Sequence, residues 1–396
     1  DILSAKDNFN EYNNKNSIKK MNNFTSADLS KISKLILSSS KGVIIAGGGI
    51  KNTQGYEDVI KLSKILNIPI VSSAGHGDTI PFEENLYAGQ MGPRGNPVAS
   101  KLVKDADLII ALGTRLGFNS TFFSYENINK DASIIQVDVD PSSLGRYFPI
   151  VFGVCADAKN FTKELIKNIS LKKEIIKTEK WTKNFLDQRK KYLKKRDELA
   201  DLKNSPIQPS GIFKILRDVI PKNAAITLDA GTLCLQATDM LNFSKPPSFF
   251  TPLDFGLVGF SFACGLGVKL AKPNSHVISL IGDGGFGMTI SELSTAVQNN
   301  IKTIIIVMNN ECWGAEKAYQ RDFFNKRYIG SDIKSPKFEK LAELYGAKGF
   351  YVKKITQFKK TIIAALNCNK PVVININVDP NALISFRKDS FKHRRE

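Results

Sequence analysis

The chain has 396 residues, of which 42% are hydrophobic and 24% are charged. This length and composition supply cores for two or more domains and exclude a mostly disordered protein. Apolar runs such as Ile304 to Met308 are far shorter than the roughly 18 residues that a membrane span needs. We therefore expect no association with a membrane.

Lys and Arg outnumber Asp and Glu by 56 to 38, which gives a net charge of +18. Such a surplus is common in nucleic-acid-binding proteins, but no recognition motif accompanies it here. The densest basic stretch, residues 163–203, also contains acidic residues throughout, which predicts a helix surface of mixed charge. We expect no nucleic-acid partner, and we expect the positive field to favour anionic small-molecule substrates.

Five cysteines are scattered along the chain and never form a C-x-x-C pair. This pattern argues against a disulfide framework and a zinc site, and it favours the cytoplasm, which is reducing. The chain opens on Asp1-Ile2-Leu3-Ser4, without an initiator Met or an apolar signal sequence. We therefore expect it to begin inside a longer protein.

The first half of the chain predicts one α/β domain. Residues 1–25 are rich in Asn and Lys and predict a linker or tail. The elements expected next are helices over 28–38 and 56–66 and strands over 43–46, 68–72, 108–112 and 134–139. Apolar strands that alternate with helices predict a parallel sheet covered on both faces, here in residues 26–170.

A second α/β pattern follows a charged helical linker in residues 171–205. In residues 206–396 we expect strands over 225–228, 276–281, 302–308 and 372–378, with helices that include 212–219 and 338–345. The sequence therefore predicts an α/β protein with two doubly wound parallel-sheet domains.

The most informative motif lies at the ends of two of these strands. Gly282-Asp283-Gly284 ends one strand and Asn309-Asn310 ends the next, and Thr289 to Glu292 between them predicts a capping box that opens a helix running to about Asn300. A right-handed crossover places both strand ends at one edge of the sheet, where ligands of α/β proteins bind. The oxygens of Asp283 and Asn310 suit Mg²⁺, and Gly282, Gly284 and Gly285 allow a diphosphate to approach the backbone.

This pattern resembles the cofactor motif of the thiamine-diphosphate (ThDP) enzymes related to acetolactate synthase and pyruvate decarboxylase. The resemblance covers residues 26–380 and implies their central and C-terminal, diphosphate-binding domains. It implies that Asp283, Asn310 and the carbonyl of Cys312 bind Mg²⁺. It also implies that Gly231 and Thr232 contact the diphosphate, that Val258 supports the thiazolium ring and that the Gly256 carbonyl accepts from the aminopyrimidine.

Within this family, the C-terminal segments most resemble the sulfoacetaldehyde acetyltransferases. The resembling segments are Trp313 to Lys317, Asp322 to Arg327 and Phe386 to Asp389. The implied reaction converts sulfoacetaldehyde and phosphate to acetyl phosphate and sulfite. Lys317 and Arg387 are candidate contacts to the anionic substrate.

Three further expectations follow from the resemblance. The central domain of acetolactate synthases can hold FAD, but the residues after Arg115 depart from that pattern, so we expect no FAD. The Glu that activates the cofactor belongs to an N-terminal domain, which we expect before residue 1. Because that domain of one subunit faces the diphosphate domain of another, we expect a homodimer or homotetramer.

Two alternatives to the acetyltransferase stay open. An acetolactate synthase or 2-oxo-acid decarboxylase would share every cofactor residue named above. A chain that retains the fold without catalytic activity is the other alternative, because the activating Glu is not found in these residues.

Overall fold

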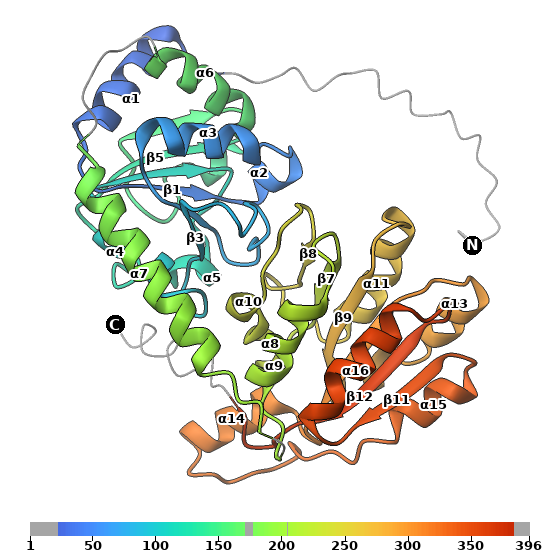
Figure 1. Cartoon of the computed structure of the whole chain (residues 1–396). Coiled ribbons are helices and arrows are strands. Elements are labelled where there is room, and N and C mark those ends of the chain that lie inside the picture. The colour runs from blue at the N-terminus through green and yellow to red at the C-terminus, as the bar shows by residue number, and fades with distance from the viewer. Residues whose placement is uncertain (1–22, 171–176, 204, 384–396) are drawn as a thin grey trace, which may run out of the picture.

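The computed structural model describes residues 23–170, 177–203 and 205–383, which form two six-stranded sheets flanked by helices (Figure 1). Every strand pair in both sheets is parallel. The predicted fold class, two parallel-sheet α/β domains, is confirmed. Among the described residues, no helix has the length and apolar character needed to cross a membrane.

The central domain has the strand order β3-β2-β1-β4-β5-β6. Its strands are β1 (Gly42–Ala46), β2 (Ile70–Ser72), β3 (Tyr87–Gln90), β4 (Leu108–Leu112), β5 (Ser133–Asp138) and β6 (Phe152–Cys155). Its helices are α1 (Ser26–Ser38), α2 (Gly48–Asn52), α3 (Tyr56–Leu66), α4 (Pro97–Asp105), α5 (Phe118–Thr121) and α6 (Ala158–Ser170). Alternate residues of β1 enter different cores, with Ile44 on one face and Ile45 on the other, as expected for a sheet buried on both sides.

The C-terminal domain has the strand order β11-β12-β10-β9-β7-β8. Its strands are β7 (Ala225–Leu228), β8 (Phe249–Phe250), β9 (Val277–Gly282), β10 (Ile304–Asn309), β11 (Lys348–Val352) and β12 (Val372–Asn377). Its helices are α8 (Pro209–Val219), α9 (Thr232–Leu235), α10 (Ala237–Met240), α11 (Phe260–Ala271), α12 (Asp283–Thr289), α13 (Glu292–Gln298), α14 (Gly314–Phe323), α15 (Phe338–Leu344) and α16 (Ile355–Leu366). Residues of β10 again divide between two cores, as Ile306 and Ile305 show.

The predicted strands match observed ones to within two residues at each end. The strands that the sequence pattern missed are β3, β6, β8 and β11, and each is an edge strand of its sheet. An edge strand pairs on one side only and is less buried, so it lacks the continuous apolar run that marks an inner strand.

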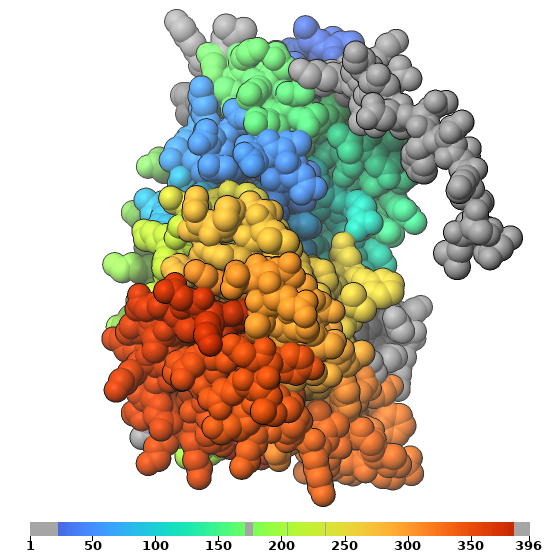
Figure 2. Space-filling model, turned by 90° about the vertical axis from the view of Figure 1, so that its right-hand side faces the viewer, coloured from blue at the N-terminus to red at the C-terminus, as the bar shows by residue number. Residues whose placement is uncertain are grey.

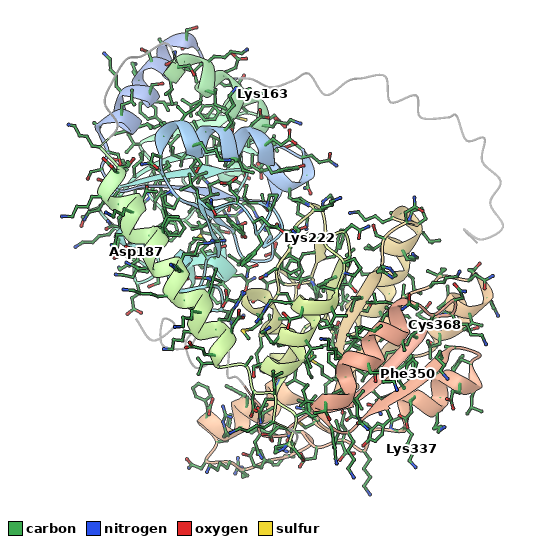
Figure 3. All side chains as sticks on the ribbon, viewed as in Figure 1. Lys163, Asp187, Lys222, Lys337, Phe350 and Cys368 are labelled. Atoms are coloured by element: carbon green, nitrogen blue, oxygen red, sulfur yellow. The ribbon has the colours of Figure 1, made fainter. Side chains whose placement is uncertain are left out.

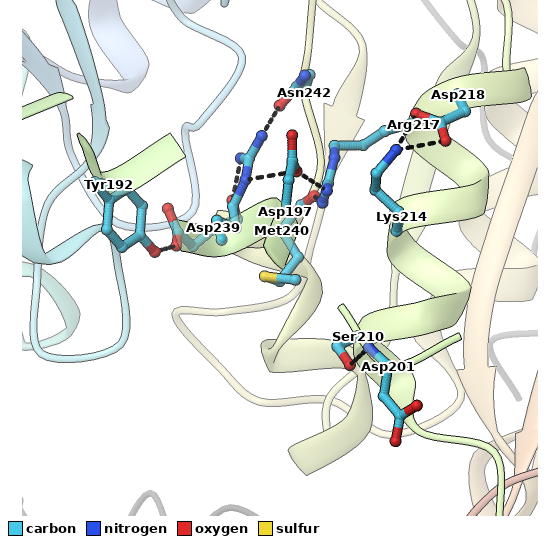
Figure 4. A network of polar contacts seen from close by, with 11 residues as sticks. Tyr192, Asp197, Asp201, Ser210, Lys214, Arg217, Asp218, Asp239, Met240 and Asn242 are labelled. Carbon is cyan, nitrogen blue, oxygen red and sulfur yellow. Dashed lines mark hydrogen bonds and ion pairs between the residues drawn. The ribbon is translucent and has the colours of Figure 1, made fainter. Parts of the chain in front are cut away.

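Helix α7 (Glu179–Glu198) connects the two domains. The sequence predicts a charged spacer here, but the structure shows that α7 also packs on the central sheet. Phe185 is fully buried in its core, and the Trp181 indole donates to the Gly42 carbonyl at 3.0 Å. The other end of α7 contacts the C-terminal domain, where the Tyr192 hydroxyl donates to the Asp239 carboxylate (Figure 4).

The charged surface is spread over both domains. Lys163 on α6, Asp187 on α7, Lys222 before β7 and Lys337 before α15 are all exposed (Figure 3). Mixed charges of this kind keep a protein in solution without adding much to its folding stability.

Where the surfaces of the two domains meet (Figure 2), a buried ion pair within the central domain contacts β8 of the C-terminal domain. Lys51 of α2 lies 3.0 Å from Asp78, whose side chain is fully buried. Asp78 also accepts from the backbone N–H groups of Ser248 and Phe249, and the Lys51 ammonium donates to the Phe249 carbonyl. The central domain therefore holds β8, the edge strand of the C-terminal sheet, through charge-assisted hydrogen bonds.

Asp78→Ala should lower the free energy of unfolding by about 3–5 kcal/mol, because it removes the counter-ion of the largely buried Lys51 ammonium and the acceptor of two buried backbone N–H groups. Urea denaturation of the full-length protein measures the effect. The matched control is Asp105→Ala, which removes the exposed ion pair with Lys101 and should cost less than about 1 kcal/mol. Equal effects of the two substitutions would contradict the role of Asp78.

Candidate functional site

Three neighbouring strand ends form the floor of the candidate site. β9 pairs with β7 and with β10, and the register places Leu280 beside Leu228 and Gly282 beside Met308. The residues that follow these strands therefore lie at one edge of the sheet. The sequence predicts this convergence from the strand–helix–strand crossover, and the register confirms it.

The proposed metal ligands lie within reach of one another. One amide atom of Asn310 is 3.3 Å from Asp283 Oδ1 and 3.3 Å from the Cys312 carbonyl oxygen. With the amide oxygen of Asn310 at this position, it lies close to Asp283 Oδ1 and to the Cys312 carbonyl oxygen. None of these three oxygen atoms can donate a hydrogen bond to another when Asp283 is ionised. A hard divalent cation would satisfy all three, whereas the amide nitrogen at the same position would donate to the other two oxygens.

Asp283 is held rigidly before any ligand binds. Its side chain is only 2% exposed, and its Oδ2 accepts from the Ser335 hydroxyl at 2.6 Å. Burial raises the pKa of Asp283, because the ionised form is poorly solvated there. A bound cation would reverse this effect and favour the carboxylate.

Asp229, which follows β7, positions the loop that carries Gly256 and Val258. Its two carboxylate oxygens accept from the backbone N–H groups of Gly259 at 3.0 Å and Ser261 at 3.1 Å. Burial raises the pKa of Asp229 to about 6, although these hydrogen bonds lower it. The carboxylate therefore fixes the start of α11 against the end of β7.

Glycine is required where these parts meet. A Cβ at Gly285 would lie 2.3 Å from Asp229 Oδ2 and 3.4 Å from Val258, and a Cβ at Gly284 would lie 2.7 Å from the Trp313 ring. Neither position has space for a side chain. The backbone of Gly284 and Gly285 can instead come close to a ligand.

Thr232 supplies a polar group that suits an anionic ligand. Its side chain is 3% exposed, and its hydroxyl has no hydrogen-bond partner within the described part of the chain. A buried hydroxyl without a partner is unfavourable, so a bound acceptor would remove that cost.

These groups surround one cavity of about 590 Å³. All ten predicted cofactor positions line it, namely Gly231, Thr232, Gly256, Val258, Gly282, Asp283, Gly284, Gly285, Asn310 and Cys312. The volume lies within the usual range for a small-molecule site.

The cavity also has residues that the sequence did not identify. Arg94, Phe118 and Asn119 reach it from the central domain, and the Asn119 side chain donates to the Leu253 carbonyl at 3.1 Å. No local pattern could identify these residues, because only the packing of the two domains brings them to the cavity.

Of the two substrate candidates, Lys317 does not line the cavity. The Lys317 ammonium pairs with Asp332 at 2.6 Å and faces the Tyr328 ring, and the hydrogen bond with Asp332 raises its pKa. Arg387 lies outside the described residues.

The predicted capping box at Thr289 to Glu292 is wrong. Helix α12 follows β9 directly and runs to Thr289, so the chain between the strands holds two short helices instead of one. Thr289, the N-cap of the predicted box, is instead the last residue of α12, and its hydroxyl donates to the Gly285 carbonyl at 3.4 Å. An N-cap needs extended backbone geometry, which the preceding helix prevents here.

The central domain has a cavity of its own, of about 450 Å³, at the carboxyl ends of its strands. Its lining includes Gly48, Gly113 and Arg115, and Arg115 pairs with Asp254 of the C-terminal domain at 3.1 Å. The expectation that no FAD binds stays a prediction.

Comparison with known proteins agrees with this architecture. Residues 29–165 match the central domain of the thiamine pyrophosphate (TPP, or ThDP) enzymes, and residues 229–376 match their C-terminal TPP-binding domain. The chain is 33% identical to the sulfoacetaldehyde acetyltransferase of Castellaniella defragrans, over 91% of this chain and 64% of the relative.

Two further relatives extend the comparison. The sulfoacetaldehyde acetyltransferase of Alcaligenes xylosoxydans xylosoxydans is 30% identical, over 92% of this chain and 65% of the relative. A probable acetolactate synthase large subunit of Methanococcus aeolicus is 30% identical, over 90% of this chain and 61% of the relative. The chain thus spans less than two thirds of the length of these relatives. Together with the two parallel sheets, these matches show that the chain belongs to the thiamine pyrophosphate enzymes, of which it contains the central domain and the C-terminal TPP-binding domain.

Proposed function

We propose that the cavity between the two domains binds ThDP together with Mg²⁺. The observation that carries this proposal is the convergence of Asp283 Oδ1, the Asn310 amide and the Cys312 carbonyl in a cavity that is also lined by Thr232, whose buried hydroxyl has no partner among the described residues. With the amide oxygen of Asn310 turned toward the other two, these groups would hold Mg²⁺ through oxygen ligands, which this cation prefers. Thr232 and the backbone at Gly284 would contact the diphosphate.

The chain's own residues would orient the cofactor. When bound, ThDP supplies a nucleophilic carbon that attacks the carbonyl of an aldehyde or 2-oxo acid. Val258 belongs to the loop that Asp229 fixes and would support the thiazolium ring, while the Gly256 carbonyl would accept from the aminopyrimidine. The buried Asp229 carboxylate would keep this loop in place through the reaction.

For the whole protein, we propose the reaction of a sulfoacetaldehyde acetyltransferase. Two relatives with that name, at 33% and 30% identity, support this proposal. Sulfoacetaldehyde and phosphate would give acetyl phosphate and sulfite. The relatives with the acetolactate synthase name, at a similar identity, support the alternative reaction, which begins with a 2-oxo acid.

An apolar groove beside the cavity supports a proposed homodimer or homotetramer. It runs along α11 and is lined by Ala263, Cys264, Gly267, Val268 and Ala271, and Val258 belongs to both the groove and the cavity. Exposed apolar surface of this kind marks a contact with another protein surface.

The described Cys155, Cys264, Cys312 and Cys368 are free thiols, which supports a cytoplasmic location.

Asp283→Ala should abolish Mg²⁺-dependent ThDP binding. We expect the affinity to fall by more than about 100-fold, because changes to outer-shell partners alone cost about 10- to 100-fold. Isothermal titration of ThDP into the full-length protein, with and without Mg²⁺, measures this. Glu292→Ala, an acidic residue on α13 that does not line the cavity, is the control and should bind normally. Unchanged affinity in Asp283→Ala would refute the metal assignment.

The proposed reaction should release sulfite from sulfoacetaldehyde, in amounts equal to the acetyl phosphate formed, and only when phosphate, ThDP and Mg²⁺ are present. Pyruvate should release little CO₂ under the same conditions. The assay of both products on the full-length protein separates the two reactions. CO₂ release from pyruvate without sulfite release would favour the acetolactate synthase or decarboxylase reaction.

The full-length protein should sediment as a dimer or tetramer, because burial of the groove along α11 removes apolar surface from water. Analytical ultracentrifugation at several protein concentrations, followed by assay of each fraction, provides the measurement. A monomer that is fully active would contradict this proposal.

A further inference from the structure

The ionisable side chains around the cavity are unevenly distributed. Among the described residues that line it, four are acidic, namely Asp229, Asp254, Asp283 and Glu316, and one is basic, Arg94. Mg²⁺ would offset Asp283, and Arg115 pairs with Asp254 at 3.1 Å, so the net negative charge of the lining is small, but its acidic side chains still outnumber the basic one. A substrate with a sulfonate or phosphate therefore needs a cation on the cavity wall, and Arg94 is the group in that position.

The loop that carries Arg94 has a fixed shape. It follows β3, and it closes through hydrogen bonds from Gly95 N to the Gly92 carbonyl at 2.9 Å and from Asn96 N to the Gln90 carbonyl at 2.7 Å. Gly92 has φ +113°, and a Cβ there would lie 2.7 Å from the Asn119 carbonyl, so only glycine allows this turn to pack against helix α5.

Aromatic rings hold the guanidinium itself. It lies 5.4 Å from the centre of the Phe122 ring, a cation–π contact, and Phe122 stacks on Phe118 at 4.9 Å. Phe118 lines the same cavity. An arginine whose plane is supported in this way loses little entropy when it binds a planar pair of oxygens.

Arg94 also joins the two domains at the cavity. The Thr238 hydroxyl of α10 donates to the Arg94 carbonyl at 3.4 Å. Asp283 and Asn310 belong to the C-terminal domain, so the proposed cofactor anchor and Arg94 occupy walls from different domains. The proposed metal ligands therefore lie on one wall of the cavity, and Arg94, the candidate contact for a second anion, lies on another.

We propose that Arg94 is a specificity-determining residue that binds the oxyanion of the substrate, either the sulfonate of the aldehyde or the inorganic phosphate. The proposal rests on the proposed function, because it assigns the substrate end of the same cavity. A guanidinium forms two parallel hydrogen bonds to the oxygens of a sulfonate or phosphate, and an ammonium cannot reproduce that geometry.

The test uses the full-length protein loaded with ThDP and Mg²⁺, and two probes that undergo no reaction alone: 2-hydroxyethanesulfonate and inorganic phosphate. Isothermal titration measures each affinity. We expect Arg94→Ala to weaken the binding of at least one probe by about 10-fold or more, as the loss of charge-assisted hydrogen bonds implies. Arg94→Lys should give an intermediate affinity, and ThDP should bind all variants with nearly the same affinity.

The matched control is Arg146→Ala. Arg146 is an exposed arginine of the same domain and also lies over an aromatic ring, that of Tyr147 at 5.3 Å, but it does not line the cavity. Its substitution should leave both probe affinities unchanged. The probe that Arg94→Ala weakens identifies the anion, sulfonate or phosphate, and the KM for the corresponding substrate should rise more than kcat falls.

Two outcomes would overturn the proposal. Unchanged affinity for both probes in Arg94→Ala would exclude an anion site, and an equal loss of ThDP affinity would make Arg94 a cofactor contact. If Arg94→Ala does not fold, Arg94→Lys decides by the same comparison. If the wild type releases no sulfite while probe binding still depends on Arg94, the proposed reaction fails and the anion site stands.

Discussion

The parallel pairing of β7, β9 and β10 is the constraint on which the rest of the site depends. Because the three strands run in the same direction, their following loops meet at one edge, and Asp229, Asp283 and Asn310 come together from distant parts of the chain. Each carboxylate then has a separate role. Asp229 accepts from the backbone of a loop, whereas Asp283 keeps an oxygen directed toward Asn310. One sheet edge thus supplies both the support and the candidate metal ligands.

Residues of both domains line the cavity. Its floor belongs to the C-terminal sheet, and part of its wall belongs to the loop after β3 and to helix α5 of the central domain. The hydrogen bonds of Lys51 and Asp78 with the backbone of Ser248 and Phe249, and the contacts of α7, hold these parts together. Buried charged groups need well-defined partners, so this interface favours one relative position of the domains over others.

The charges of the cavity suit a negatively charged cofactor and substrate in different ways. Carboxylate and carbonyl oxygens gather where a divalent cation would bridge protein and diphosphate. The basic group of the described lining, Arg94, lies on the wall from the other domain. The net charge of +18 acts on the molecule as a whole, but the local placement of these few groups decides what the cavity can bind.

The sequence by itself determined the inner strands and the glycine–aspartate motif, because both depend on neighbours in the chain: apolar runs mark strands buried on both faces, and Gly282 to Gly285 are consecutive. Tertiary structure alone decided the edge strands, the two short helices after Asp283 and the ion pair of Lys317 with Asp332. It also brought Arg94 to the cavity. These features depend on contacts between distant segments, and no local pattern encodes such contacts.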